Sequence, residues 1–320
     1  MRAADLAPLR AFDPEWVDRL AAFEPPPEGL LLPSLDEAPA LLDRLGVLPQ
    51  DAAALLEHWP SAGWPPHFTW ALAHVYALVH ADLGGYVWLS PGPVLPEQLG
   101  PAANLLYWYA YLALTAPARG YHLEHRIPDE VSWTTLAELG RDIEDDRELG
   151  GFDRHATVGW LTLHVRGGIY ELGRLQFQRH SAPPNIRAAS GSDWALSVHI
   201  PPLGPLTPEA CDASLDRARE LFARCFPEEP YGAAFCDSWL LDPQLAEYLP
   251  EDSNIVRFQR RFTLTDDTSQ GRADVLRFVF RVPRDTPIET LPRRTKLERA
   301  LAEHLEAGRE WHVRRGWFAL

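Results

Sequence analysis

The sequence predicts a protein of the α+β or α/β class, with a helical N-terminal domain followed by a mixed β-sheet with flanking helices. Three observations predict this architecture. The chain of 320 residues is long enough for two modest domains, each with its own core. Apolar residues recur at helical spacing in the first 150 residues. From Gly150-Gly151 onward their period changes to two, as in strands, so we place the domains at residues 1–150 and 151–320.

The composition is that of a globular protein and argues against several functional classes. Hydrophobic residues make up 46% and charged residues 23%, near the globular average. The net charge of −15 argues against a nucleic-acid partner, which would need a basic surface. Three cysteines are too few for a disulfide framework, the N-terminus lacks an apolar signal core, and no stretch of 18 uncharged apolar residues occurs. We therefore expect a cytoplasmic protein without a membrane partner.

Charge is distributed unevenly between the two halves. Residues 1–150 hold 22 acidic and 8 basic side chains, whereas residues 151–320 hold 23 acidic and 22 basic ones. An anionic ligand would therefore bind in the second half.

Helical spacing and helix-end signals predict the elements of the first half. Asp13 followed by Pro14 is typical of an N-cap and a first helical turn, and the prolines at 25–27 end that helix. Further helices are predicted over residues 38–45, 52–59, 68–83, 96–116 and 129–148. Seven of the 12 tryptophans lie in this half, where they either fill the core or line a hydrophobic acceptor pocket.

The second half is predicted to alternate strands with a few helices. A hairpin of strands 158–165 and 169–179 is joined by a tight turn at Gly167-Gly168. A strand at 194–200, a proline-rich loop, a helix from 208 to about 225 capped by Thr207, a strand at 233–241 and a short helix at 242–249 follow. Strands at 254–265 and 275–282, a helix at 295–307 and a strand at 311–318 complete the domain.

This order of elements resembles the core of the GNAT (general N-acetyltransferase) fold, and three strings make the resemblance closer. They are WLTLHVRGGIYELGRLQFQR at 160–179, LSVHIPPLGPLTPEACDAS at 196–214 and CDSWLLDPQLAEYLPEDSNIVRFQRRF at 236–262. They are similar to a family of bacterial acyltransferase-domain proteins with a helical N-acyltransferase N-terminal domain and a GNAT-like C-terminal domain. The resemblance covers nearly the whole chain. It implies acetyl-CoA or another acyl-CoA as co-substrate, no tightly bound cofactor, and a small-molecule amine as acceptor.

In the GNAT superfamily, backbone N–H groups in the loop before a helix hold the pyrophosphate of coenzyme A. The loop that matches here spans residues 201–207, and its three prolines have no N–H. The remaining donors are those of Leu203, Gly204, Leu206 and Thr207. The superfamily pattern of an Arg or Gln followed by two spaced glycines is absent, and Glu209 adds a negative charge at the helix start. The loop is therefore either the pyrophosphate site or only a rigid turn from strand to helix.

Two residues are the first candidates for proton transfer. Strand parity separates His199 from the apolar face of Leu196 and Val198, so it can act as a general base or remain a hydrogen-bonded core histidine. The resemblance implies that a backbone N–H near residues 198–200 polarises the thioester carbonyl. It also assigns to Tyr248 the protonation of the leaving thiolate; the alternative is an aromatic residue that caps a helix end.

Other polar residues in the predicted strands are candidates for substrate binding. His164 forms a polar row with Thr162 and Arg166, and Arg174 forms one with Gln176 and Gln178. Cys236 and Ser238 lie where the strand should diverge from its neighbour to admit an acyl-pantetheine arm. Asp237, with opposite parity, is the next candidate base, an amine ligand or a turn residue. Cys236 is either a nucleophile or a buried apolar thiol, and no metal-ligand spacing is present.

Two functional classes follow from these features. The first is an acyl-CoA-dependent acyltransferase in which a primary amine attacks the thioester directly; a variant of it takes the acyl group from an acyl carrier protein. The second is a non-catalytic GNAT-like scaffold or acyl-thioester-binding module, which the missing glycines favour. The polar residues in the strands favour the enzyme.

Overall fold

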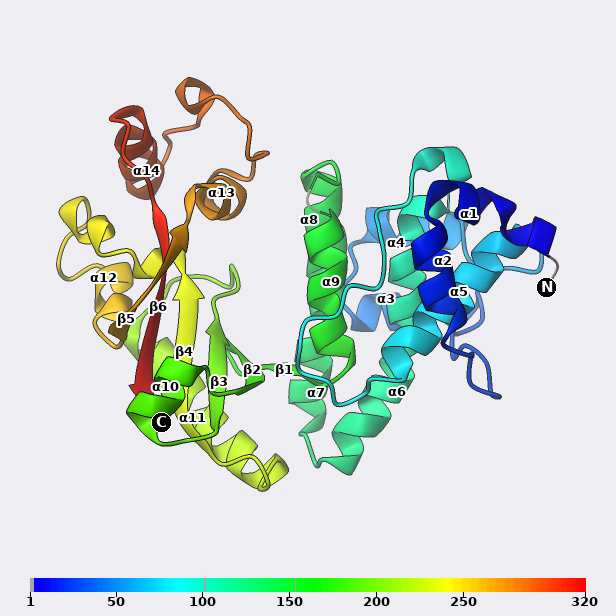
Figure 1. Cartoon of the computed structure of the whole chain (residues 1–320), viewed down its shortest axis with the longest axis horizontal. Helices are drawn as coiled ribbons and strands as arrows, with labels where there is room; N and C mark the ends of the chain where they lie inside the picture. Colours follow the sequence, from blue (N-terminus) through cyan, green and yellow to red (C-terminus); the bar gives the residue numbers. More distant parts are fainter. Residues whose placement is uncertain (1–2, 101, 153) are drawn as a thin grey trace. The chain divides into compact units, whose positions relative to one another are not determined.

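The computed structural model describes residues 3–100, 102–152 and 154–320 (Figure 1). By compactness the chain divides into two units, Met1–Tyr170 and Glu171–Leu320. The division after residue 150 thus stays a prediction, and the helix that follows residue 153 belongs to the first compact unit. None of the helices in the described ranges combines the length and apolarity needed to cross a bilayer.

The first unit is built from helices, as the apolar spacing predicts. Its helices are α1 (Ala7–Phe12), α2 (Pro14–Ala21), α3 (Ala38–Arg44), α4 (Pro49–Glu57), α5 (Pro66–His80), α6 (Leu106–Glu124), α7 (Asp129–Leu136), α8 (Glu138–Glu148) and α9 (Arg154–Val165). Short 3₁₀ turns lie at Ala3–Leu6, Glu97–Leu99 and Ala103–Leu105. The predicted N-cap is confirmed: the Asp13 carboxylate accepts a hydrogen bond of 2.8 Å from the Trp16 N–H.

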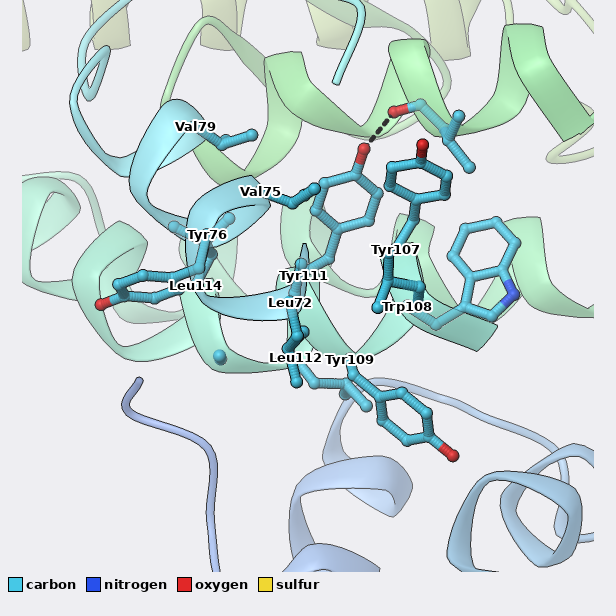
Figure 2. Packing of buried hydrophobic residues seen from close by; sticks show 14 of the residues in the cluster. Leu72, Val75, Tyr76, Val79, Tyr107, Trp108, Tyr109, Tyr111, Leu112 and Leu114 are labelled. Carbon is cyan, nitrogen blue, oxygen red and sulfur yellow. Dashed lines mark hydrogen bonds between the residues drawn. The ribbon is translucent and has the colours of Figure 1, made fainter. Parts of the chain in front are cut away.

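The core of the first unit forms around α5 and α6 (Figure 2). Tyrosines of α6 bury their rings there and donate their hydroxyl protons to backbone carbonyls, which removes the cost of burying a polar group. Tyr109 donates to Leu55 at 2.8 Å, Tyr107 donates to Pro93 at 2.7 Å, and Tyr111 donates to Val158 of α9. Trp16 and Trp108 are fully buried in the same cluster, which supports the core interpretation for these two tryptophans.

The predicted strand at 158–165 is wrong, because these residues form most of α9. Val158, Leu161 and Val165 fit a helical repeat as well as Leu161, Leu163 and Val165 fit a strand. The helix is buried on nearly all sides, so it lacks the polar face that would reveal a period of 3.6. The polar row of Thr162, His164 and Arg166 is therefore not a strand row.

Six strands in the described residues form one mixed sheet in the order β1-β2-β3-β4-β6-β5. The strands are β1 (Ile169–Glu171), β2 (Gln176–Ser181), β3 (Trp194–His199), β4 (Tyr231–Ser238), β5 (Thr263–Gln270) and β6 (His312–Ala319). Strands β3 and β4 are parallel, whereas β2 with β3, β4 with β6 and β5 with β6 are antiparallel. Figure 1 shows β6, the last strand of the chain, between β4 and β5. The predicted mixed sheet is confirmed.

Helices and short turns connect these strands. The helices are α10 (Pro184–Ser190), α11 (Pro208–Cys225), α12 (Asn254–Gln259), α13 (Arg272–Val275) and α14 (Lys296–Glu306). The turns are the 3₁₀ segments η4 (Trp239–Leu241), η5 (Pro243–Glu247) and η7 (Ile288–Thr290) and the π-helical η6 (Leu276–Phe280). The predicted helices at 208–225 and 295–307 are confirmed, and Thr207 caps α11 by accepting from the Ala210 N–H at 3.2 Å.

Two further strand predictions in the second half are wrong. Residues 254–259 form α12, because the Ser253 hydroxyl accepts from the Val256 N–H at 3.3 Å and caps a helix there; β5 begins only at Thr263. Residues 272–280 form α13 and η6 instead of a strand. Their alternating apolar residues include Phe278, whose exposure of 58% shows that the apparent period of two did not reflect burial.

Candidate active site

The parallel strands β3 and β4 separate near their carboxyl ends. β3 stays paired with β2 as far as His199, and β4 stays paired with β6 as far as Ser238. Among the described residues of β3 and β4, mutual pairing stops at Ser197 and Phe235. Beyond this pair β3 and β4 no longer pair with each other, so the two strands diverge at this end of the sheet.

The register places a polar row on one face of the sheet beside this point. Gln178 lies opposite Ser197, and Gln176 lies opposite His199. His199 Nε2 is 2.9 Å from Gln178 Oε1, a diagonal contact between neighbouring strands. Gln176 instead donates its amide N–H to Glu171 Oε2 at 3.2 Å. The parity predicted for His199 is therefore confirmed, and its side chain is half-buried at the end of β3.

The loop at 201–207 follows β3 directly and is held by Arg174. The guanidinium donates from Nη1 to the carbonyl of Pro201 at 2.7 Å and from Nε to the carbonyl of Pro205 at 3.3 Å. The backbone N–H of Arg174 donates to Ser214 Oγ of α11 at 2.9 Å. Burial lowers the pKa of Arg174 below that of a free guanidinium. Arg174 thus fixes both ends of the loop and contributes a cation next to it.

The backbone N–H groups of the loop differ in their availability. The N–H of Leu203 donates to the Pro201 carbonyl at 2.8 Å and is already used. Those of Gly204, Leu206 and Thr207 make no hydrogen bond to the described part of the chain. Gly204 adopts φ +97°, and an added Cβ would meet open space, so a larger residue there strains the backbone without blocking a neighbour. Three of the four predicted donors are therefore available.

A second arginine lies at the first turn of α11. Arg261 donates to the Pro208 carbonyl at 3.1 Å and forms an ion pair with Asp212. The positive charges of Arg261 and Arg174 both lower the pKa of Cys211 on this turn, although burial raises it more. Two arginines and the N-terminus of an 18-residue helix thus surround the loop, which favours an anion despite the exposed Glu209.

The structure gives Tyr248 partners at the end of the short turn η5. Its hydroxyl lies 2.9 Å from Nδ1 of His304 and accepts from Arg309 Nη1 at 3.2 Å. His304 is fully buried, stacks on Trp311 with a centroid distance of 3.9 Å, and has Nε2 3.3 Å from the Glu310 carbonyl. Burial lowers the pKa of His304, so its ring is neutral and Nδ1 accepts the tyrosine proton.

The residues at the end of β4 are either buried or bonded to nearby groups of the protein. Cys236 is fully buried, and burial raises its thiol pKa, so it remains protonated and fits the interpretation as an apolar thiol. Asp237 accepts from Arg315 Nε at 2.7 Å and from Arg315 Nη2 at 2.6 Å. Ser238 caps η4 by accepting from the Leu240 N–H at 3.1 Å.

In the first unit, Thr162 and His164 of the predicted polar row lie in α9, and Arg166 directly follows that helix. His164 is buried with Nδ1 3.4 Å from the Trp160 carbonyl, one helical turn back. Trp160 donates from Nε1 to Glu138 Oε1 of α8 at 3.2 Å. Arg166 is fully buried and donates to the Thr162 carbonyl at 2.8 Å and to Asp82. These bonds connect helices and a loop of the first unit, as a structural network does.

Comparison with known proteins assigns the chain to a family. Residues 36–167 match the model of an N-acyltransferase N-terminal domain, and residues 169–318 match that of a GNAT-like C-terminal domain. The structure of an acyltransferase in complex with decanoyl-CoA and teicoplanin is 40% identical, with a TM-score of 0.87 over 95% of this chain and 94% of that chain. The protein belongs to the GNAT-like N-acyltransferases.

Two other solved acyltransferases are similar to this N-acyltransferase to the same degree. One, a tryptophan-to-alanine mutant in complex with octanoyl-CoA, is 39% identical with a TM-score of 0.86, and the match covers 95% of this chain and 94% of that one. The other, in complex with CoA and 10C-teicoplanin, is 39% identical with a TM-score of 0.87 over the same shares. Among curated proteins, none matches significantly.

Several side-chain contacts of this N-acyltransferase cannot be predicted from its sequence, because they form only in the folded chain. Gln178 belongs to the predicted polar row, but its contact with His199 depends on the register between β2 and β3. Arg261, His304 and Arg309 meet their partners across 53 to 61 residues of sequence. No local pattern marks such pairs. In the described ranges, no group of three or more His, Cys, Asp or Glu side chains is arranged to hold a metal ion.

Proposed function

We propose that this protein transfers the acyl group of an acyl-CoA to a primary amine of a small-molecule acceptor. The observation that carries the proposal is the end of β3: there the parallel strands separate, His199 faces the polar row, and the next residues form a loop with available N–H groups. The related acyltransferases with octanoyl-CoA, decanoyl-CoA and teicoplanin support a medium-length acyl chain and a small-molecule acceptor.

The loop and its arginines would bind the donor. The N–H groups of Gly204, Leu206 and Thr207 would donate to the pyrophosphate of coenzyme A, where the dipole of α11 also favours anions. The pantetheine arm would pass between the diverging ends of β3 and β4 and place the thioester near residues 198–200. A backbone N–H at this position would polarise the thioester carbonyl.

The reaction would proceed by direct attack. The amine nitrogen forms a bond to the thioester carbon, the carbon–sulfur bond breaks, and His199 takes the proton that the amine loses. Thiols ionise near pH 8.5, so the sulfur can leave as a thiolate and take a proton from water. Tyr248 is the predicted acid for this last step, but its proton is shared with His304. We therefore propose water as the proton source and a structural role for Tyr248, through its contacts with His304 and Arg309.

The test is an assay of the purified protein with acetyl-CoA, octanoyl-CoA and decanoyl-CoA, each with teicoplanin and with glucosamine as acceptors. Thiol release measures donor consumption, and mass spectrometry detects an acceptor that gains one acyl group through its amine. We expect turnover with octanoyl-CoA or decanoyl-CoA. Thermal stabilisation by these donors without any turnover would contradict the enzyme and favour the binding module.

A parallel assay separates the two classes of donor. Decanoyl-CoA and a decanoyl carrier protein are compared at equal thioester concentration, with free CoA added as a competitor in both. We expect turnover with decanoyl-CoA and inhibition by CoA, because the loop offers N–H groups for a pyrophosphate that the carrier protein lacks. Turnover with the carrier protein alone would move the donor site away from this loop.

A further inference from the structure

The hydrogen bond between Gln178 and His199 fixes which nitrogen of the imidazole can accept a proton. Gln178 Oε1 is an acceptor, so His199 Nε2, 2.9 Å away, must carry the proton and donate it. In a neutral imidazole the other nitrogen, Nδ1, then carries the lone pair. We propose that Gln178 is a positioning residue that holds His199 in this tautomer and makes Nδ1 the general base. This inference rests on the proposed function.

Gln178 is itself held in place by the sheet. It lies within β2, with 8% of its surface exposed, and stands opposite Ser197 of β3. Its contact with His199 is the diagonal one that long side chains make between antiparallel strands. The residue directly opposite His199 is Gln176, whose amide is turned to Glu171. Gln178 therefore contacts the imidazole through Oε1, while the amide of Gln176 donates to Glu171.

The neutral amide has a specific consequence for proton transfer. Gln178 Oε1 accepts the Nε2 proton both before and after Nδ1 takes a proton from the amine, so the pair needs no rearrangement during the step. A carboxylate at this position would also orient the ring, but its charge would favour the imidazolium. Gln178 thus supplies orientation without adding a charge.

Several strands place charged and titratable groups on the sheet face that carries His199. On the same face, by register, β1 contributes Glu171, β2 contributes His180, β4 contributes Asp237 and β6 contributes Arg315, while Arg174 precedes β2. The carboxylate of Glu171 is bonded to Gln176, and that of Asp237 is bonded to Arg315. A carboxylate introduced at residue 178 would contact the imidazole directly, as Gln178 Oε1 does.

The test combines the tautomer with the pH profile of the full chain. Long-range ¹H–¹⁵N spectra of histidine-labelled protein, assigned with His199→Ala, report which nitrogen of His199 is protonated. We expect a proton on Nε2 in the wild type and a mixture of tautomers in Gln178→Leu. In Gln178→Glu the Nε2 proton should remain, and the midpoint of the His199 titration should rise by about 1 to 3 pH units.

The kinetic readout separates positioning from a merely structural role. We expect Gln178→Leu to lower kcat at least about tenfold with little change in KM for acyl-CoA. Gln178→Glu should recover the plateau rate at high pH, with the acid limb of kcat/KM displaced to higher pH. The matched control is Gln270→Glu, the same change at an exposed position of β5, which should leave the profile unchanged. Thermal melts of each variant show whether the fold is intact.

Each outcome decides the inference. A wild-type His199 protonated on Nδ1, or a Gln178→Glu variant whose titration midpoint does not move, would overturn it even if the enzyme is active. If the wild type turns over no acyl-CoA, the proposed function fails, and the spectra still decide the tautomer. If Gln178→Leu does not fold, Gln178→Glu alone tests the inference, because glutamate is nearly the same size as glutamine.

Discussion

Two segments differ in what their polar groups bind: residues 199–207, from the last residue of β3 through the following loop, and residues 237–248, from the last residues of β4 to the end of η5. In residues 199–207, His199 contacts a neutral amide, and the N–H groups of Gly204, Leu206 and Thr207 make no hydrogen bond to the described part of the chain. In residues 237–248, the polar groups have protein partners: Asp237 binds Arg315, Ser238 caps η4, and Tyr248 binds His304 and Arg309.

This difference indicates that the first segment can bind a ligand, whereas the second segment contributes to the stability of the fold. Polar groups already paired with the protein contribute to stability, and using them for a ligand would first break those bonds. Groups without protein partners on a surface loop can bind a ligand at no such cost. We therefore expect changes in residues 199–207 to affect turnover and changes in residues 237–248 to affect mainly the free energy of unfolding.

The largest expected effect comes from His199. General-base assistance accelerates a reaction by roughly 100- to 10,000-fold, so His199→Ala should lower kcat at least about tenfold even if water partly replaces the imidazole. The melting temperature should change little, because the side chain is only half-buried. Initial rates with decanoyl-CoA and a thermal melt of the same preparation check both quantities.

Asp237→Asn is the matched comparison in residues 237–248. The carboxylate of Asp237 is occupied by Arg315, and the ion pair is partly exposed, so its loss should cost at most about 1 kcal/mol and leave kcat within twofold. If Asp237→Asn abolished turnover while His199→Ala kept it, Asp237 would be the base and the contrast between the two segments would be reversed.

Arg174 should affect donor binding more than the chemical step. Arg174→Met removes the hydrogen bonds to the carbonyls of Pro201 and Pro205, which frees the loop and removes a cation. We expect KM for acyl-CoA to rise roughly tenfold, with a smaller change in kcat. Arg174→Lys keeps the charge but not the two bonds and should be intermediate. An unchanged KM in Arg174→Met would show that the loop does not bind the donor.

Gly204→Val gives a second measure of the loop. Valine at φ +97° is strained, so the loop should change conformation and bind CoA more weakly, although the added side chain has open space around it. Isothermal titration with CoA measures the affinity, and Gly308→Val, at φ +73° after α14, is the control for strain elsewhere. Equal affinity in Gly204→Val and wild type would place the pyrophosphate at another position.

A smaller effect is expected at Tyr248. Tyr248→Phe removes the hydrogen bonds to His304 and Arg309 and should lower the free energy of unfolding by about 0.5–1.5 kcal/mol. Turnover should stay within about twofold, because water would protonate the thiolate. Urea denaturation and initial rates measure the two quantities. A large loss of kcat at unchanged stability would instead restore Tyr248 as the catalytic acid.

The buried His304 gives stability a pH dependence of known sign. Burial lowers its pKa in the folded state below the ordinary value of 6.5, so the unfolded state binds a proton more readily. Its contribution is present above pH 6.5 and is lost as pH falls below that value. Denaturation at pH 7.5 and pH 5.5 should show a smaller decrease in His304→Gln than in wild type, and an equal decrease in both would contradict this account.

The sequence predicted the order of domains, the mixed sheet and the face of His199, because these depend on local period and strand parity. It failed at residues 158–165, where a helix buried on most sides has no polar face to show its period. It identified the loop at 201–207 from its prolines, but not Arg174 as its clamp, because that contact joins residues 27 and 31 positions apart. The pairing of Asp237 with Arg315 required the register of β4 with β6.

The central claim is that the segment after β3, and not the one after β4, binds the acyl donor. Hydrogen–deuterium exchange of the full-length protein, with and without saturating CoA, tests this claim at both segments at once. We expect CoA to slow exchange at residues 203–207, where N–H groups would donate to the pyrophosphate, and to leave residues 237–248 unchanged. Protection at 237–248 with none at 203–207 would contradict the account.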